Sequence, residues 1–163
     1  MFIRMAAATA AAATLAACGG GDETTAPTRG GGAVLTTDQI IIEGTDTMRF
    51  IPNQFAVRAG AEITLIFRNT GVMPKESMGH NLAVLDGTVA PNTFSAAAIS
   101  HPANEYIPPD FEDKVIATTP ILGPGEEETL VFTAPAEPGE YPFVCSFPGH
   151  TEAGMRGVMT VVE

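Results

Sequence analysis

The chain has 163 residues, of which 45% are hydrophobic and 17% charged, and its formal net charge is −11. This length suits one domain with its own core and an additional N-terminal segment. A multi-span membrane protein is excluded, because no run of about 18 apolar residues is free of small and polar interruptions. The acidic excess would repel a polyanion, so we expect no nucleic-acid partner.

Residues 1–17 have the layout of a bacterial signal peptide. A single basic residue, Arg4, precedes an alanine-rich apolar stretch of the usual length. The stretch ends in the letters LAAC, which close at Cys18 and resemble the lipobox of bacterial lipoproteins. In that family the peptide is cut before the cysteine, and the thiol then carries a lipid. An ordinary cleaved signal peptide that happens to contain a cysteine is the alternative.

Residues 18–32 are predicted to be a lipid-anchored flexible tether, and residues 33–163 the folded domain. The tether is rich in Gly, Thr and Pro and has no core-forming residue. We therefore expect an extracytoplasmic lipoprotein on the periplasmic side, held at a membrane through Cys18. Acylation of Cys18 leaves Cys145 without a disulfide partner, because the chain has two cysteines. A lone thiol outside the cytosol is prone to oxidation unless something occupies it.

The folded part is predicted to be all-β. Short segments recur at intervals typical of an antiparallel β-sandwich, and Gly and Pro turn signals separate them. In residues 62–69, for example, Ile63, Leu65 and Phe67 alternate with Glu62, Thr64 and Arg68 and so share one buried face. The segments expected to be strands are 34–43, 47–51, 55–59, 62–69, 80–85, 114–119, 126–133, 140–145 and 156–162.

Residues 86–113 interrupt this strand pattern. The alanine-rich stretch 93–100 predicts a short helix, and the sequence after it is typical of a loop. A long insertion in a sandwich is usually functional or a capping flap, and we expect a flap here. His101 belongs to it and has no partner at ligand spacing, so a surface position is expected.

The C-terminal part of the chain carries three side chains that bind soft metals. Cys145 ends a predicted strand, His150 follows five residues later, and Met155 comes another five residues on. One loop can therefore aim a thiolate, an imidazole and a thioether at one point. A second imidazole, His80, opens segment 80–85 and can approach from a neighbouring edge. Two imidazoles, a thiolate and a weak thioether are the ligand set of a trigonal blue-copper centre, so we expect one type 1 copper per chain.

The motifs SMGHN at residues 77–81 and CSFPGH at residues 145–150 resemble those of azurin and the auracyanins, in the cupredoxin family. The likeness runs through about residues 38–163. It implies an eight-stranded Greek-key β-sandwich with a short helical flap. It also implies a one-electron carrier, not an enzyme, whose copper cycles between Cu(II) and Cu(I).

The resemblance further assigns roles to residues beside the ligands. It implies that the Gly79 carbonyl lies near the copper, on the side opposite Met155, and that Asn81 braces the cysteine loop. In azurin the last ligand follows the histidine by four residues, whereas Met155 follows His150 by five. An apolar patch is implied where redox partners dock, such as cytochromes or a membrane electron-transfer complex. The patch residues are Met73, Pro74, Met78, Phe147, Pro148, Gly149 and Ala153.

Other functions were weighed against the same residues. Copper nitrite reductases and multicopper oxidases need a further copper bound by several histidines, and this chain has three histidines in all. A Cys–His nucleophile pair lacks the other groups that acyl transfer requires. Copper sequestration or delivery stays open, because it differs from electron transfer in exchange kinetics and not in ligands. Zinc can also occupy such a site in a recombinant preparation. Met159 lies in the last predicted strand, so we expect it in the core.

Overall fold

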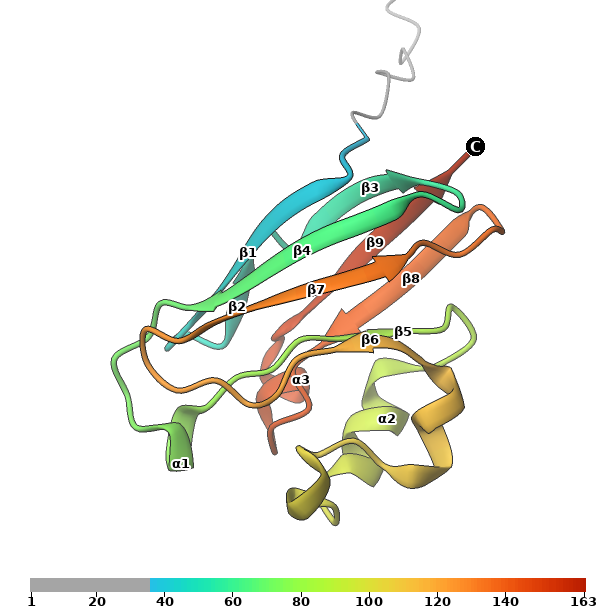
Figure 1. The fold of residues 1–163 in the computed structure, drawn as a ribbon. Helices are drawn as coiled ribbons and strands as arrows, with labels where there is room; N and C mark the ends of the chain where they lie inside the picture. The colour runs from blue at the N-terminus through green and yellow to red at the C-terminus, as the bar shows by residue number, and fades with distance from the viewer. Residues whose placement is uncertain (1–35) are drawn as a thin grey trace, which may run out of the picture. The chain divides into compact units, whose positions relative to one another are not determined.

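The computed structural model describes residues 36–163, so the predicted signal peptide, the tether and Cys18 lie outside the described residues. The described part is a β-sandwich with a helical flap beside one sheet (Figure 1). Its strands are β1 (Gln39–Thr45), β2 (Arg49–Ile51), β3 (Gln54–Arg58), β4 (Glu62–Asn69), β5 (Ala83–Leu85), β6 (Val115–Thr118), β7 (Glu127–Thr133), β8 (Gly139–Val144) and β9 (Arg156–Val162). The α-helices are α1 (Lys75–Met78), α2 (Pro91–Ala98) and α3 (His150–Ala153), and the 3-10 helices are η1 (Pro102–Asn104) and η2 (Pro109–Lys114).

One sheet has the strand order β2-β1-β4-β7, and the other has the order β3-β9-β8-β5-β6. The β-sandwich prediction is confirmed. Most strand pairs are antiparallel, as the strand spacing indicated, but β1 pairs with β4 in parallel and β3 pairs with β9 in parallel. After β2 the chain crosses to the other sheet as β3 and then returns as β4 beside β1. This crossing gives β1 and β4 the same direction.

Residues 36–163 contain nine strands, where the resemblance implied eight. The additional strand arises because β2 and β3 belong to different sheets and only Pro52 and Asn53 separate them. Proline has no N–H to donate to a ladder, so β2 ends before Pro52. The segment 80–85 is shorter than expected: His80 forms an isolated bridge with Leu122, and the regular strand begins at Ala83.

The core lies between the two sheets and follows the alternation seen in the sequence. Ile63, Leu65 and Phe67 on β4 have no exposed surface. Met159 on β9 is also fully buried, which confirms its predicted place in the core. The Phe50 ring packs against the Phe67 ring at a centroid distance of 5.8 Å. Burial of each large apolar side chain contributes about 1.5–3 kcal/mol, and the packed sheets form a rigid support for the loops at their end.

The flap has a small apolar core of its own. Helix α2 begins two residues earlier than predicted, because Pro91 is favoured at the first turn of a helix. Phe94 of α2 is fully buried and meets the Phe111 ring edge-on at 5.6 Å. This cluster packs on β5 and on Val144, the last residue of β8. His101 is partly exposed.

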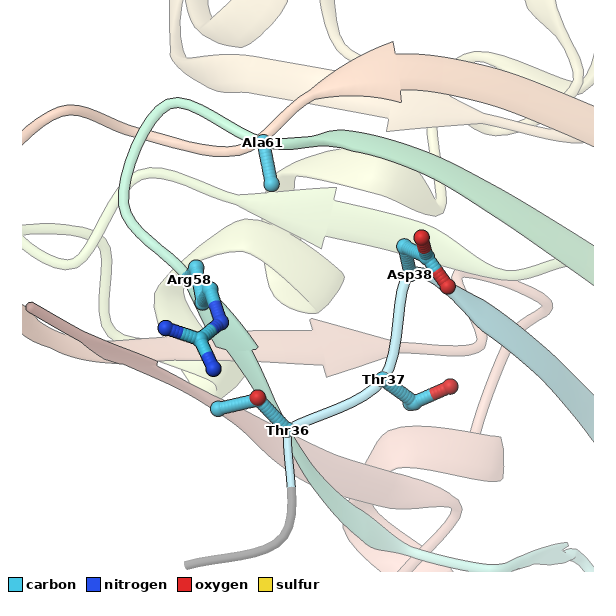
Figure 2. Close-up of a pocket in the computed structure, with 5 residues that line it drawn as sticks. All are labelled: Thr36, Thr37, Asp38, Arg58 and Ala61. Atoms are coloured by element: carbon cyan, nitrogen blue, oxygen red, sulfur yellow. The ribbon is translucent and has the colours of Figure 1, made fainter.

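Residues 36–163 contain no helix with the length and apolar character needed to cross a membrane. A surface hollow of about 240 Å³ lies where β3 ends and β4 begins (Figure 2). It is at the end of the sandwich away from α1 and α3 (Figure 1). Its lining residues are Thr36, Thr37, Asp38, Arg58 and Ala61. None of these is a cysteine or histidine, so the hollow offers no soft-metal donor.

Candidate metal centre

Three of the four predicted ligands converge at one end of the sandwich. His80 lies between α1 and β5, Cys145 directly follows β8, and His150 is the first residue of α3. The His80 and His150 Nδ1 atoms are 3.1 Å apart, and the Cys145 Sγ lies 3.9 Å and 3.4 Å from them, respectively. All three side chains are buried, and His150 keeps only 3% of its surface exposed.

The spacing of these three atoms suits a transition metal. A point equidistant from atoms with these separations lies about 2.0 Å from each, which is close to the usual metal–ligand bond lengths of roughly 2.0–2.3 Å. The Nε2 atom of His80 is buried and has no hydrogen-bond partner among the described residues. The Nδ1 atom of this ring is the one that lies beside the other two donors.

Burial shifts the pKa of each of the three donor side chains. Desolvation raises the pKa of the Cys145 thiol to about 12, against the opposing effect of backbone hydrogen bonds. Desolvation and, to a smaller extent, the neighbouring His80 ring together lower the pKa of His150 to about 4. The pKa of His80 is also lowered by burial, although the Asp46 carboxylate opposes this. At neutral pH both imidazoles are therefore neutral and can bind a metal, while the thiol must lose its proton. Copper is thiophilic enough to replace that proton.

The backbone ties Met155 to the other predicted ligands. Its N–H donates to the His150 carbonyl at 2.8 Å, and its carbonyl accepts from the Cys145 N–H at 3.1 Å. The Met155 side chain is fully buried in the same apolar cluster as Cys145. The main chain of β1 approaches it closely, since a Cβ atom on Gly44 would lie 3.0 Å from the Met155 Cε.

Asn81 and Thr151 hold the chain on either side of Cys145. The Asn81 Oδ1 accepts from the Ser146 N–H at 2.8 Å and so links the His80 segment to the cysteine loop. The Thr151 hydroxyl donates to the Cys145 carbonyl at 2.7 Å and is fully buried. Sequence reasoning missed Thr151. Its position directly after His150, in the loop that leads to Met155, could have indicated a role in holding this loop.

Gly79 occupies a place that no larger residue could take without displacement. A Cβ atom there would lie 2.5 Å from the Ile121 Cγ2 and 2.6 Å from the Lys75 carbonyl oxygen. Its N–H donates to that same carbonyl at 2.8 Å and ends α1 directly before His80. The predicted place of the Gly79 carbonyl beside the copper stays a prediction.

Aromatic rings from the flap and the ligand loop cover His150. The Phe147 ring lies 4.7 Å from the His150 ring at an interplanar angle of 33°, and Tyr106 of the flap packs on Phe147 at 5.5 Å. Among the residues predicted to form the apolar patch, Met73 is 41% exposed. Val72 beside it is 83% exposed, the largest value among the exposed large hydrophobic side chains of residues 36–163. The sequence analysis did not include it in the patch.

Comparison with known proteins agrees with this donor set. Residues 37–162 match the family described as copper binding proteins of the plastocyanin/azurin family. The chain is a member of this cupredoxin family. As a cupredoxin with His80, Cys145, His150 and Met155 in this arrangement, it has a type 1 copper site.

Several relatives of this cupredoxin are known. It is 36% identical over 124 residues to outer membrane protein H.8 of Neisseria meningitidis, and the match covers 75% of this chain and 66% of that protein, just under two thirds of its length. It is 34% identical to azurin iso-2 of Methylomonas sp., with 72% of this chain and 92% of the azurin covered. The crystal structure of auracyanin from Roseiflexus castenholzii superposes with a TM-score of 0.71 at 34% identity and covers 79% of this chain and 100% of the auracyanin.

Proposed function

We propose that this cupredoxin carries single electrons between redox proteins and is not an enzyme. The observation that carries the proposal is the burial of His80, Cys145, His150 and Met155, whose side chains are between 0% and 3% exposed. When bound, the copper supplies a one-electron couple, Cu(II)/Cu(I). With all four positions taken by protein side chains, no open position is left for a substrate, as metal-ion catalysis would require.

The chain's own residues hold these donors in a fixed arrangement. His80 exchanges two backbone hydrogen bonds with Leu122, at 3.1 Å and 2.7 Å. Cys145 is bonded through its main chain to Met155 and Thr151. Donors that are held in this way move little when the charge at the centre changes, and a small rearrangement keeps electron transfer fast.

Electrons are proposed to enter and leave through the apolar surface near His150. Val72 and Met73, which precede α1, are exposed, and the Phe147 ring lies against His150. Proposed partners are cytochromes or a membrane electron-transfer complex that docks on this surface. The net charge of −11 favours a partner with a positively charged docking face and speeds its approach.

We further propose that the protein works outside the cytoplasm, anchored to a membrane by a lipid on Cys18. The lipobox-like ending of residues 1–17 supports this. So does the similarity to a Neisseria meningitidis protein that is described as an outer membrane protein.

The test of this function is a cycle of reduction and reoxidation on the copper-loaded domain. A one-electron reductant should bleach the visible thiolate-to-copper band, and an oxidised cytochrome should restore it over many cycles with no loss of copper. A Cu(I) chelator present throughout distinguishes copper delivery from electron transfer. Capture of the copper by the chelator after each reduction would contradict the carrier proposal and favour delivery.

A further inference from the structure

The Arg49 side chain connects the β1–β2 turn to the segment between His150 and Met155. Its Nη1 donates to the Met48 carbonyl at 2.8 Å and to the Ala153 carbonyl at 2.7 Å. Arg49 and Ala153 are 104 positions apart in the sequence. One guanidinium nitrogen therefore joins two segments that are far apart in the sequence.

The Ala153 carbonyl needs such a partner. It belongs to the last residue of α3, and carbonyls at the end of a helix have no partner within the helix. A guanidinium satisfies this oxygen with a charge-assisted hydrogen bond, which is shorter and stronger than a neutral one.

Gly154 continues the same contact toward Met155. Its φ of +106° is in the region that favours glycine, and a Cβ atom there would lie 3.0 Å from the Arg49 Nη1. The guanidinium thus lies against the main chain of Gly154, directly before Met155. Fixing Ala153 and Gly154 fixes the point from which the Met155 side chain starts.

A second residue of the same hairpin limits the other end of the Met155 side chain. Gly44 on β1 would, with a Cβ atom, come within 3.0 Å of the Met155 Cε and 2.9 Å of the Phe67 Cζ. Gly44 pairs with Phe50, and the adjacent Thr45 pairs with Arg49. One short hairpin therefore contacts Met155 at its methyl group and holds the main chain that leads to it.

We propose that the β1–β2 hairpin sets the position of Met155 relative to the copper, with Arg49 and Gly44 as positioning residues. Neither residue supplies a ligand atom. The axial ligand of a type 1 site tunes its reduction potential, so the hairpin tunes the ratio of Cu(I) to Cu(II) affinity. This inference rests on the copper site and not on the electron-carrier role, so either can fail without the other.

The first test uses the copper-free domain and amide hydrogen exchange in the variant Arg49→Met, which keeps an aliphatic stem and removes the donors. Exchange at Gly154 and Met155 should become at least about tenfold faster, while exchange in β4 stays unchanged. Unchanged exchange at Gly154 and Met155 would overturn the proposal. A uniform increase throughout the domain would also overturn it, because that result means a general loss of stability.

The second test measures the reduction potential of the copper-loaded variants. Arg49→Met and Gly44→Ala should each change the ratio of Cu(I) to Cu(II) affinity by about threefold or more, with the thiolate band retained. Arg49→Lys keeps N–H donors and the charge, so this variant should retain most of the wild-type ratio of Cu(I) to Cu(II) affinity. Arg58→Met is the matched control, because Arg58 lies beside the hollow at the other end of the sandwich (Figures 1 and 2). A wild-type ratio in Arg49→Met, or an equal change in Arg58→Met, would refute the positioning role.

Discussion

Asn81 and Ser146 are joined by two hydrogen bonds, and each residue directly follows a copper ligand. The Asn81 Oδ1 accepts from the Ser146 N–H at 2.8 Å, and the Asn81 Nδ2 donates to the Ser146 Oγ at 2.7 Å. The same Nδ2 donates to the Glu105 carbonyl of the flap at 3.2 Å. One buried amide thus fixes the distance between the His80 and Cys145 segments and attaches the flap to both.

We expect Asn81→Ala to lower the free energy of unfolding of the copper-free domain by about 1–3 kcal/mol, because it leaves the buried Ser146 N–H without a partner. The visible band of the copper-loaded variant should also shift, since Cys145 is held less firmly. Thermal and denaturant unfolding measure the first effect. The control is Asn92→Ala, whose amide makes an exposed bond to Arg156. Equal losses in the two variants would argue against the brace.

Replacing single ligand candidates tests the donor set. Cys145→Ser should abolish the intense thiolate-to-copper band, because the hydroxyl is a hard and weak donor to copper. His101→Ala should leave the band intact, since His101 lies in the flap and outside the cluster of donors. The measurement is a visible and paramagnetic-resonance spectrum after addition of Cu(II). Loss of the band in His101→Ala, or a tetragonal spectrum of the wild type, would refute the assignment.

The proposed lipid anchor predicts a specific N-terminus. Protein extracted from membranes should begin at Cys18 and carry a mass increment from acylation. Mass spectrometry of the intact protein measures both, and Cys18→Ser should release the protein from the membrane fraction. A mature form that begins at another residue would reject the anchor.

The sequence predicts the parts of this site that depend on residues close together in the chain, and not the parts that depend on contacts between distant segments. Local spacing was enough for Cys145, His150 and Met155, because one loop carries all three. The alternation in β4 was sufficient to identify its buried face. The contact of Arg49 with Ala153 crosses 104 positions of sequence, and no local pattern encodes it. Parallel pairing of β1 with β4 was missed for the same reason, since it depends on where the chain changes sheets.

The proposed docking surface should determine the rate of electron transfer without affecting the copper itself. Val72→Glu places a charge at a side chain that is 83% exposed. We expect the second-order rate with a cytochrome to fall about tenfold, because a buried unpaired charge is costly at a docking surface. The visible spectrum should stay unchanged. Stopped-flow kinetics give the rate, and Val131→Glu on β7, at a side chain that is 62% exposed, is the matched control. Equal rates in the two variants would show that the cytochrome does not dock at the surface that contains Val72.

The lowered pKa of His150 predicts how the copper-free domain responds to acid. In the unfolded chain this histidine takes up a proton near pH 6.5, whereas burial lowers its folded pKa to about 4. Between these values the unfolded state binds more protons, so the free energy of unfolding falls as the pH falls from about 6.5 to 4. One such group contributes a slope of at most about 1.4 kcal/mol per pH unit, and His80, whose pKa is also lowered, adds to it.

Denaturant unfolding of the copper-free domain at a series of pH values measures this slope. His150→Gln should reduce it, because the amide does not titrate. Bound copper holds the imidazoles in their neutral form, so the loaded domain should keep its stability to lower pH than the copper-free domain. A slope that is the same in wild type and His150→Gln would assign the acid sensitivity to other groups.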